Sequence, residues 1–237
     1  MGGETDQLTH GEAARLLGWW MDAGVDVAVA EEPRQWLKPG AVAHRGDISA
    51  DIAIPSPSEM PSEFNAFRSF LETATGLPMD RTGARRVLPH GLAGARIMLL
   101  SDMPAREDAS DERPIGGEAW ILATRMLAAI GMTPDDVYSA SLACFHVPGA
   151  RLDSDDLERC RAIASHHIAL VKPERLILFG DGPARALLGD QLSRVRGRVH
   201  RIEGVRTVAT FHPRWLLQRP ADKALAWRDL LLLMEEK

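Results

Sequence analysis

Three residues able to take part in hydrolytic chemistry lie just behind predicted strands. Asp102 directly follows a short apolar run, Glu107 comes five residues later, and His212 follows another such run near the end of the chain. A carboxylate can orient a water molecule or stabilise a cationic transition state. A histidine N–H can stabilise a developing anion. Each also has a structural interpretation, because an aspartate at a strand end commonly bonds nearby backbone and a histidine can cap the turn that follows.

The elements that would position these residues alternate along the chain. Apolar runs typical of buried strands occupy residues 96–100, 137–143, 175–179 and 206–211. Helical spacing of apolar residues predicts helices over 64–71, 118–130, 154–171 and 221–234, with Ser154 as an N-cap. This order predicts an α/β fold, a three-layer α/β/α arrangement with a central, mostly parallel four-stranded sheet. Ligands of such folds bind at the carboxyl ends of the strands, where the three candidates lie.

The 237 residues suffice for one α/β domain with an extension. We expect an N-terminal helical extension over 1–37, with a helix at 9–26, a Pro- and Ser-rich linker over 38–61, and the α/β domain over 62–237. No apolar run approaches the roughly 20 residues that a membrane helix needs, and the polar, acidic N-terminus does not resemble a signal peptide. Together with the low cysteine count, this predicts a cytoplasmic monomer without a membrane partner.

Positive charge is concentrated near the end of the chain, although the net charge is −5. Residues 185–219 hold eight arginines against two acidic residues. If 194–198 is an extended loop, alternate arginines point to one side and offer a strip for phosphate groups. The alternative is a solvated face of the protein. The candidate DNA-binding residues are Arg194, Arg196, Arg198, Arg201 and Arg214.

Several ordered motifs between residue 77 and the C-terminus are similar to those of a known family. Phe211-His212-Pro213-Arg214-Trp215-Leu216-Leu217 resembles a His-Pro-Ser-x-Leu-Leu motif, and Ser101-Asp102-Met103-Pro104-Ala105 stands where that family has Gly-Glu-Ala-Pro-Gly. Arg113-Pro114-Ile115-Gly116 is similar to its Pro-Phe-Val-Gly segment. The chain thus resembles the uracil-DNA glycosylase superfamily, most of all the iron–sulfur family four, as a divergent member.

The resemblance implies roles for particular residues. It assigns Asp102, Glu107 and His212 to catalysis and Met103, Ile115 and Ser141 to contact with the base. Ile115 stands where the family stacks a Phe on uracil, and Ser141 where an Asn reads the uracil edge. A single hydroxyl cannot replace both the donor and the acceptor of an amide.

The resemblance also implies an iron–sulfur cluster held by four cysteines, yet the chain has only Cys144 and Cys160. The family's N-terminal pair, expected near 77–81, is missing. We therefore expect no metal and no cofactor. A zinc site with His146 and either His166 or His167 is the alternative to ordinary buried thiols.

Two main functions remain open at this point. The first is an enzyme that hydrolyses the N-glycosidic bond of a deaminated or damaged base in DNA, which makes DNA with a modified base the partner. The alternative is a catalytically inactive DNA-binding or interaction protein that retains the fold. A nucleotide- or phosphate-binding module is a third hypothesis, supported by fold analogy alone.

Overall fold

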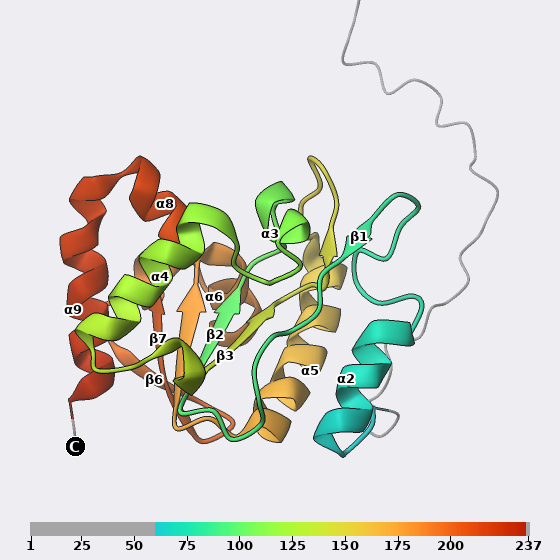
Figure 1. The fold of residues 1–237 in the computed structure, drawn as a ribbon, viewed down its shortest axis with the longest axis horizontal. Helices are drawn as coiled ribbons and strands as arrows, with labels where there is room; N and C mark the ends of the chain where they lie inside the picture. Colours follow the sequence, from blue (N-terminus) through green and yellow to red (C-terminus); the bar gives the residue numbers. More distant parts are fainter. Residues whose placement is uncertain (1–59, 236–237) are drawn as a thin grey trace, which may run out of the picture. The chain divides into compact units, whose positions relative to one another are not determined.

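The computed structural model describes residues 60–235, which form an α/β fold around one five-stranded sheet (Figure 1). The strands lie in the order β3-β2-β5-β7-β6. All neighbours are parallel except β6 and β7. Their bounds are β2 (Ile97–Ser101), β3 (Val137–Ser141), β5 (Arg175–Phe179), β6 (Val199–Ile202) and β7 (Val205–Thr210). The expected extension over 1–37 and nearly all of the linker lie outside the described residues, so the domain boundaries stay a prediction.

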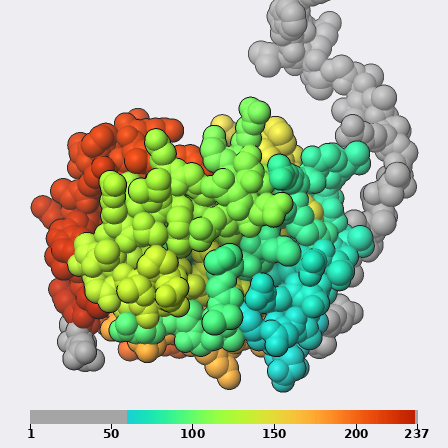
Figure 2. Space-filling model, in the orientation of Figure 1, coloured from blue at the N-terminus to red at the C-terminus, as the bar shows by residue number. Residues whose placement is uncertain are grey.

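Helices cover both faces of this sheet, which confirms the three-layer arrangement. One face is covered by α5 (Ser154–Val171), α6 (Asp181–Leu188) and α7 (Leu192–Val195), with α2 (Phe64–Thr73) against α5. The other face is covered by α4 (Gly117–Ala129) and α9 (Lys223–Met234), and α4 forms much of the surface seen in Figure 2. The remaining short elements are β1 (Arg85–Arg86), β4 (Phe145–His146), α3 (Arg106–Ser110), α8 (Pro213–Gln218) and two 3-10 turns, Pro134–Asp136 and Pro220–Asp222. Among residues 60–235, every helix is too short or too polar to cross a membrane.

The expectation of four strands was wrong by one. β6 and β7 form a hairpin through Glu203 and Gly204, whose φ angles are 47° and 78°. Two consecutive residues with positive φ suit the right-handed twist of a two-residue hairpin. The sequence did not predict β6, because this strand carries His200 and Arg201 in place of a continuous apolar run.

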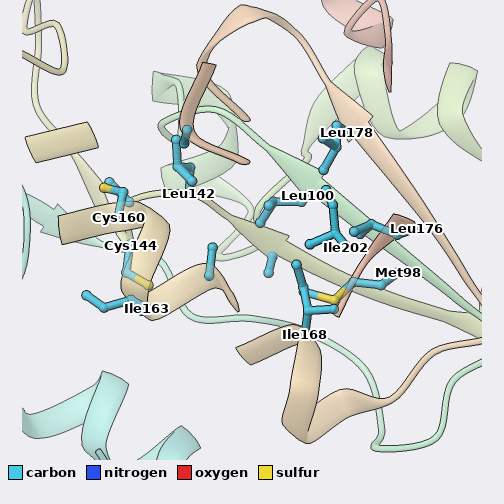
Figure 3. Close-up of a cluster of buried hydrophobic side chains, with 14 of the residues drawn as sticks. Met98, Leu100, Leu142, Cys144, Cys160, Ile163, Ile168, Leu176, Leu178 and Ile202 are labelled. Carbon is cyan, nitrogen blue, oxygen red and sulfur yellow. The ribbon is translucent and has the colours of Figure 1, made fainter. Parts of the chain in front are cut away.

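The sheet is buried on both faces because its strands alternate between two cores. Met98 and Leu100 of β2 point into the core beneath α5 and α6, whereas Ile97 and Leu99 point into the core beneath α4 and α9. Figure 3 shows the first of these cores, in which Ile168 of α5 packs over the sheet. Burial of apolar surface contributes roughly 25 cal/mol per Å², so the strands stabilise the domain through both of their faces.

The longest helix, α5, has well-defined ends. Its N-cap is Asp153, whose carboxylate accepts a hydrogen bond from the Asp156 N–H, so the assignment of the cap to Ser154 was wrong by one residue. The helix ends at Lys172, which adopts a left-handed conformation (φ 50°) immediately before Pro173.

The outer edge of β3 faces no other strand of the sheet, but it also forms backbone hydrogen bonds. Its Ser139 exchanges two backbone hydrogen bonds, of 2.9 and 2.8 Å, with His90. The segment before β2 therefore continues the ladder past the last strand.

One buried polar pair lies where α2, α5 and β3 meet. The Tyr138 hydroxyl lies 2.8 Å from Nε2 of His167, and the Phe67 ring packs on that imidazole. Burial lowers the pKa of His167 to about 3, and the nearby His166 acts in the same direction. The imidazole therefore stays neutral in the folded protein at every pH above about 4.

The neutral His167 predicts a loss of stability in acid. Its folded-state pKa lies below the unfolded value of about 6.5, so below pH 6.5 the unfolded chain binds the extra proton and folding weakens as pH falls. Between pH 7 and pH 5 this histidine accounts for a loss of about 2 kcal/mol in the free energy of unfolding. His167→Gln does not titrate, so urea unfolding at the two pH values should show a loss smaller by about that amount. Equal losses in both proteins would contradict the assignment.

Candidate active site

A cleft of about 320 Å³ lies at the carboxyl ends of β2, β5 and β7. Asp102 follows β2, Gly180 follows β5 and His212 follows β7, and all three line it. The wall is completed by Met103, Phe179, Arg214, Trp215 and Gln218. The expectation that these strand ends meet around one cleft is confirmed for Asp102 and His212.

His212 enters this cleft as a neutral hydrogen-bond donor. It is the N-cap of α8, and its Nδ1 accepts the Arg214 N–H at 3.0 Å. An accepting Nδ1 leaves the ring proton on Nε2. Burial lowers the pKa of His212 to about 3, and the positive charge of Arg214 acts in the same direction. The capping role and the donor role thus coexist, one on each ring nitrogen.

The Asp102 carboxylate rests against the first turn of α6. Its Oδ1 accepts the Met103 N–H at 2.9 Å. Burial raises the pKa of Asp102, Asp181 also raises it, and hydrogen bonds from the backbone N–H of Met103 and Gly182 oppose the shift. A Cβ atom on Gly182 would clash with Oδ1, so a larger residue at this position would displace the carboxylate. Asp102 is thus a fixed, partly desolvated carboxyl group at the cleft wall.

A buried ion pair that the sequence did not reveal holds the two sides of the site together. Asp108 is 1% exposed, and both its carboxylate oxygens contact Nη2 of Arg214, at 2.8 and 2.9 Å. The same carboxylate accepts the backbone N–H groups of Ala105 (2.7 Å) and Gly116 (2.6 Å). It therefore connects the loop after β2 and the start of α4 to Arg214, which lies two residues after His212. The only local signal was the position of Asp108 in the first turn of α3, where acidic residues cap helices.

Glu107 lies in a neighbouring cleft of about 370 Å³, not in the cleft of Asp102. It is exposed, and it shares this neighbouring cleft with Gly116 and Glu118. Arg214 and Gln218 line both clefts. Glu107 thus lies on a different cleft from Asp102, and the two clefts share Arg214 and Gln218 as lining residues.

The three base-contact candidates are placed very differently. Met103 lines the cleft with Asp102. Ile115 is 0% exposed and packs in the core beneath α4 and α9. Ser141 is 7% exposed, and its hydroxyl lies 3.2 Å from the Ser101 hydroxyl. Neither Ile115 nor Ser141 presents a surface to the cleft.

Comparison with known proteins agrees with this geometry. The profile of the Uracil DNA glycosylase superfamily matches residues 88–231, which contain all the catalytic and base-contact candidates. The chain belongs to this superfamily.

Individual members give the degree of divergence. The Type-4 uracil-DNA glycosylase of Archaeoglobus fulgidus is 27% identical over 153 residues, covering 60% of this chain and 77% of the relative. The Type-4 uracil-DNA glycosylase of Pyrobaculum aerophilum is 27% identical over 166 residues, covering 65% and 85%. A DNA polymerase of Bacillus phage SP01 is 27% identical over 159 residues, covering 66% of this chain but 16% of the polymerase.

The arginine-rich segment of this superfamily member is not the extended loop that we expected. Arg194 lies in the helix α7 and pairs with Asp190. Arg196 points inward, where it bonds the buried Asp229 at 2.9 Å. Arg198 and Arg201 are exposed, the latter on β6. Exposed positive charge is thus spread over a helix, a loop and an edge strand.

The two cysteines do not fit the iron–sulfur cluster that the resemblance to family four implies. A cluster needs four ligands, usually thiolates, and the chain has two cysteines, both buried in the core in Figure 3. Burial raises the pKa of Cys144 to about 11 and raises that of Cys160 as well, which disfavours the thiolate that binds metal. Within residues 60–235, no three His, Cys, Asp or Glu side chains are grouped to bind a metal. The histidines of the zinc alternative are engaged elsewhere, His146 with the Pro104 carbonyl and His166 with that of Pro61.

The Asp108–Arg214 pair predicts a large effect of a small substitution. Asp108→Asn preserves the shape but leaves the Arg214 charge partly buried without its counter-charge, which should lower the free energy of unfolding by roughly 3 kcal/mol. Asp135→Asn, at an exposed position, is the control and should change it by less than about 0.5 kcal/mol. Urea unfolding of both variants measures the difference, and equal stabilities would show that the pair does not hold the site together.

Proposed function

We propose that this protein is a DNA glycosylase that removes a deaminated or damaged base in base excision repair. The observation that supports this most is the neutral N–H donor of His212 lining the same cleft as the desolvated carboxylate of Asp102. The names of the Type-4 relatives support the same reaction. The partner is DNA with a modified base, and the protein acts as a cytoplasmic monomer without a cluster.

In this proposal the target base leaves the helix, because its glycosidic bond is otherwise out of reach. The bond from C1′ to the base nitrogen breaks, and its electron pair leaves with the base. The His212 Nε2–H donates to the oxygen of the departing base and stabilises the negative charge. Asp102 stabilises the cationic sugar and orients a water molecule, whose oxygen bonds C1′ and whose proton passes to the carboxylate.

The surroundings of the cleft favour a base other than uracil, or a looser selection. Ile115 and Ser141 are buried, so the aromatic face and the amide that would read uracil have no counterpart at these two positions. Met103 offers a flexible apolar surface, which accommodates several ring shapes.

The burial of Ile115 and Ser141 also supports one competing function. A protein that keeps the fold and the charged surface but cannot hold a base would bind DNA without cutting it. Excision assays separate the two.

The role of His212 can be separated from its structural role by choice of substitution. His212→Ser keeps a good N-cap for α8 but removes the ring N–H, whereas His212→Ala removes both. We expect both variants to excise 100- to 1000-fold more slowly than the wild type, with only the alanine variant losing about 1 kcal/mol of stability. The assay is a panel of single- and double-stranded oligonucleotides with uracil, hypoxanthine or xanthine, scored by alkali-labile abasic sites. Full activity of the serine variant would exclude the donor role, and binding without excision across the panel would favour the inactive protein.

DNA binding should depend on the exposed arginines and not on the inward Arg196. The triple substitution Arg194→Ala, Arg198→Ala and Arg201→Ala should flatten the slope of log affinity against log salt by up to about three, or roughly 0.9 for each lost contact with duplex phosphate. The effect should be the same for every DNA sequence, because phosphate contacts carry no sequence information.

A control removes the same charge from other exposed positions. Its three substitutions, on α4, on α5 and just before β2, are Arg125→Ala, Arg161→Ala and Arg96→Ala. Its salt slope should match the wild type. Equal flattening in both triple variants would mean that net charge, and not this surface, sets the affinity.

A further inference from the structure

A second, larger cleft of about 480 Å³ adjoins the proposed catalytic cleft. The two share Gly180, His212 and Trp215 as a common wall. The rest of its lining consists of Asp181 at the start of α6, Leu192 and Ser193 of α7, and the Arg196 and Phe211 side chains. The proposed reaction does not use this space.

The wall of the second cleft is aromatic and held in place. The rings of Phe211 and Trp215 are parallel to within 8°, with centroids 6.4 Å apart. The Arg196 guanidinium lies 4.9 Å from the Phe211 centroid and the Arg219 guanidinium 4.4 Å from that of Trp215. The indole N–H of Trp215 donates to Asp222 at 2.8 Å, so this ring is oriented before any ligand arrives.

The exposure of Trp215 and the charge of Arg219 beside it favour a flat ligand joined to a phosphate group, because the charged residues of the wall itself, Arg196 and Asp181, are already paired with Asp229 and Arg185. Trp215 remains 40% exposed although it is fixed by three neighbours. Arg219 makes no ion pair within residues 60–235, so its charge is available to a phosphate group. Aromatic surface bordered by arginine is the arrangement by which proteins stack nucleobases and hold the backbone that joins them.

We propose that the second cleft binds the base of the nucleotide next to the target, stacked on Trp215. This rests on the proposed function, because the target nucleotide is assigned to the first cleft. Since His212 belongs to both walls, a strand that places one base beside it brings the adjoining nucleotide to the Phe211–Trp215 surface. The stack would replace the contact that the neighbour loses when the target leaves the helix.

A binding experiment tests this without requiring excision. The probe is a single-stranded oligonucleotide with a non-cleavable abasic analogue at the target position and either adenine or a second abasic analogue at the neighbouring position, on the 5′ or the 3′ side. Wild-type protein should bind the adenine probe at least fivefold more tightly on one of the two sides, as expected for loss of one base–aromatic stack. Trp215→Leu should bind both probes with equal affinity, and Trp215→Phe should retain most of the preference.

The matched control is Trp227→Leu, a tryptophan on α9 with the same 40% exposure that lies outside both clefts. It should keep the full wild-type preference. Equal binding of the two probes by wild-type protein on both sides, or a preference that survives in Trp215→Leu, would overturn the proposal.

The outcome is distinguishable from failure of the proposed function. Excision without any neighbour preference refutes the second cleft alone, and a Trp215-dependent preference in a protein that excises nothing refutes only the enzyme. A protein that binds none of the probes refutes the stacking subsite.

Discussion

The arrangement of the site depends on one buried carboxylate, that of Asp108. Two backbone N–H groups and the Arg214 guanidinium converge on it. Charge-assisted hydrogen bonds of this kind are shorter and stronger than neutral ones, and in a dry interior they tolerate little displacement. Because Arg214 follows Pro213 at the start of α8, the pair also limits the position of the His212 ring. Asp108 and Arg214 are 106 residues apart in sequence. Their contact fixes the segment after β2 to the segment after β7.

The candidate catalytic residues and two of the candidate base-contact residues differ in their exposure to the cleft. Asp102 and His212 stay at the cleft, each held by a backbone N–H that leaves part of the side chain available. The other two side chains are turned away from the cleft. Ser141, at the end of β3, bonds the Ser101 hydroxyl, and Ile115, just before α4, is enclosed by the core. The aromatic surface that remains open lies on the other side of His212, at Phe211 and Trp215. The surface around Asp102 and His212 is therefore more open on the side of Phe211 and Trp215 than on the side of Ile115 and Ser141.

The sequence predicted those helices and strands whose ends are marked by local patterns. The bounds of α5 and β5 were predicted to the residue, because Pro173 separates the helical period of α5 from the apolar run of β5, although the N-cap of α5 is Asp153 and not Ser154. The strand-end rule predicted that Asp102 and His212 lie close together, and both line one cleft. The inward turns of Arg196 and Arg214 were not predictable, since each is drawn to an aspartate, Asp229 or Asp108, far away in the chain. A count of arginines gives their charge but not the partner that each one finds on folding.

The two outer strands give the sheet an unequal pair of edges. β3 is continued by the His90 segment, so the hydrogen-bonding groups around Ser139 are already used. β6 is only four residues long, and it carries the exposed, charged Arg201. Strands of other molecules add most readily to long, flat and uncharged edges. A second chain would find little to extend here, so this sheet is a poor template for intermolecular β-aggregation.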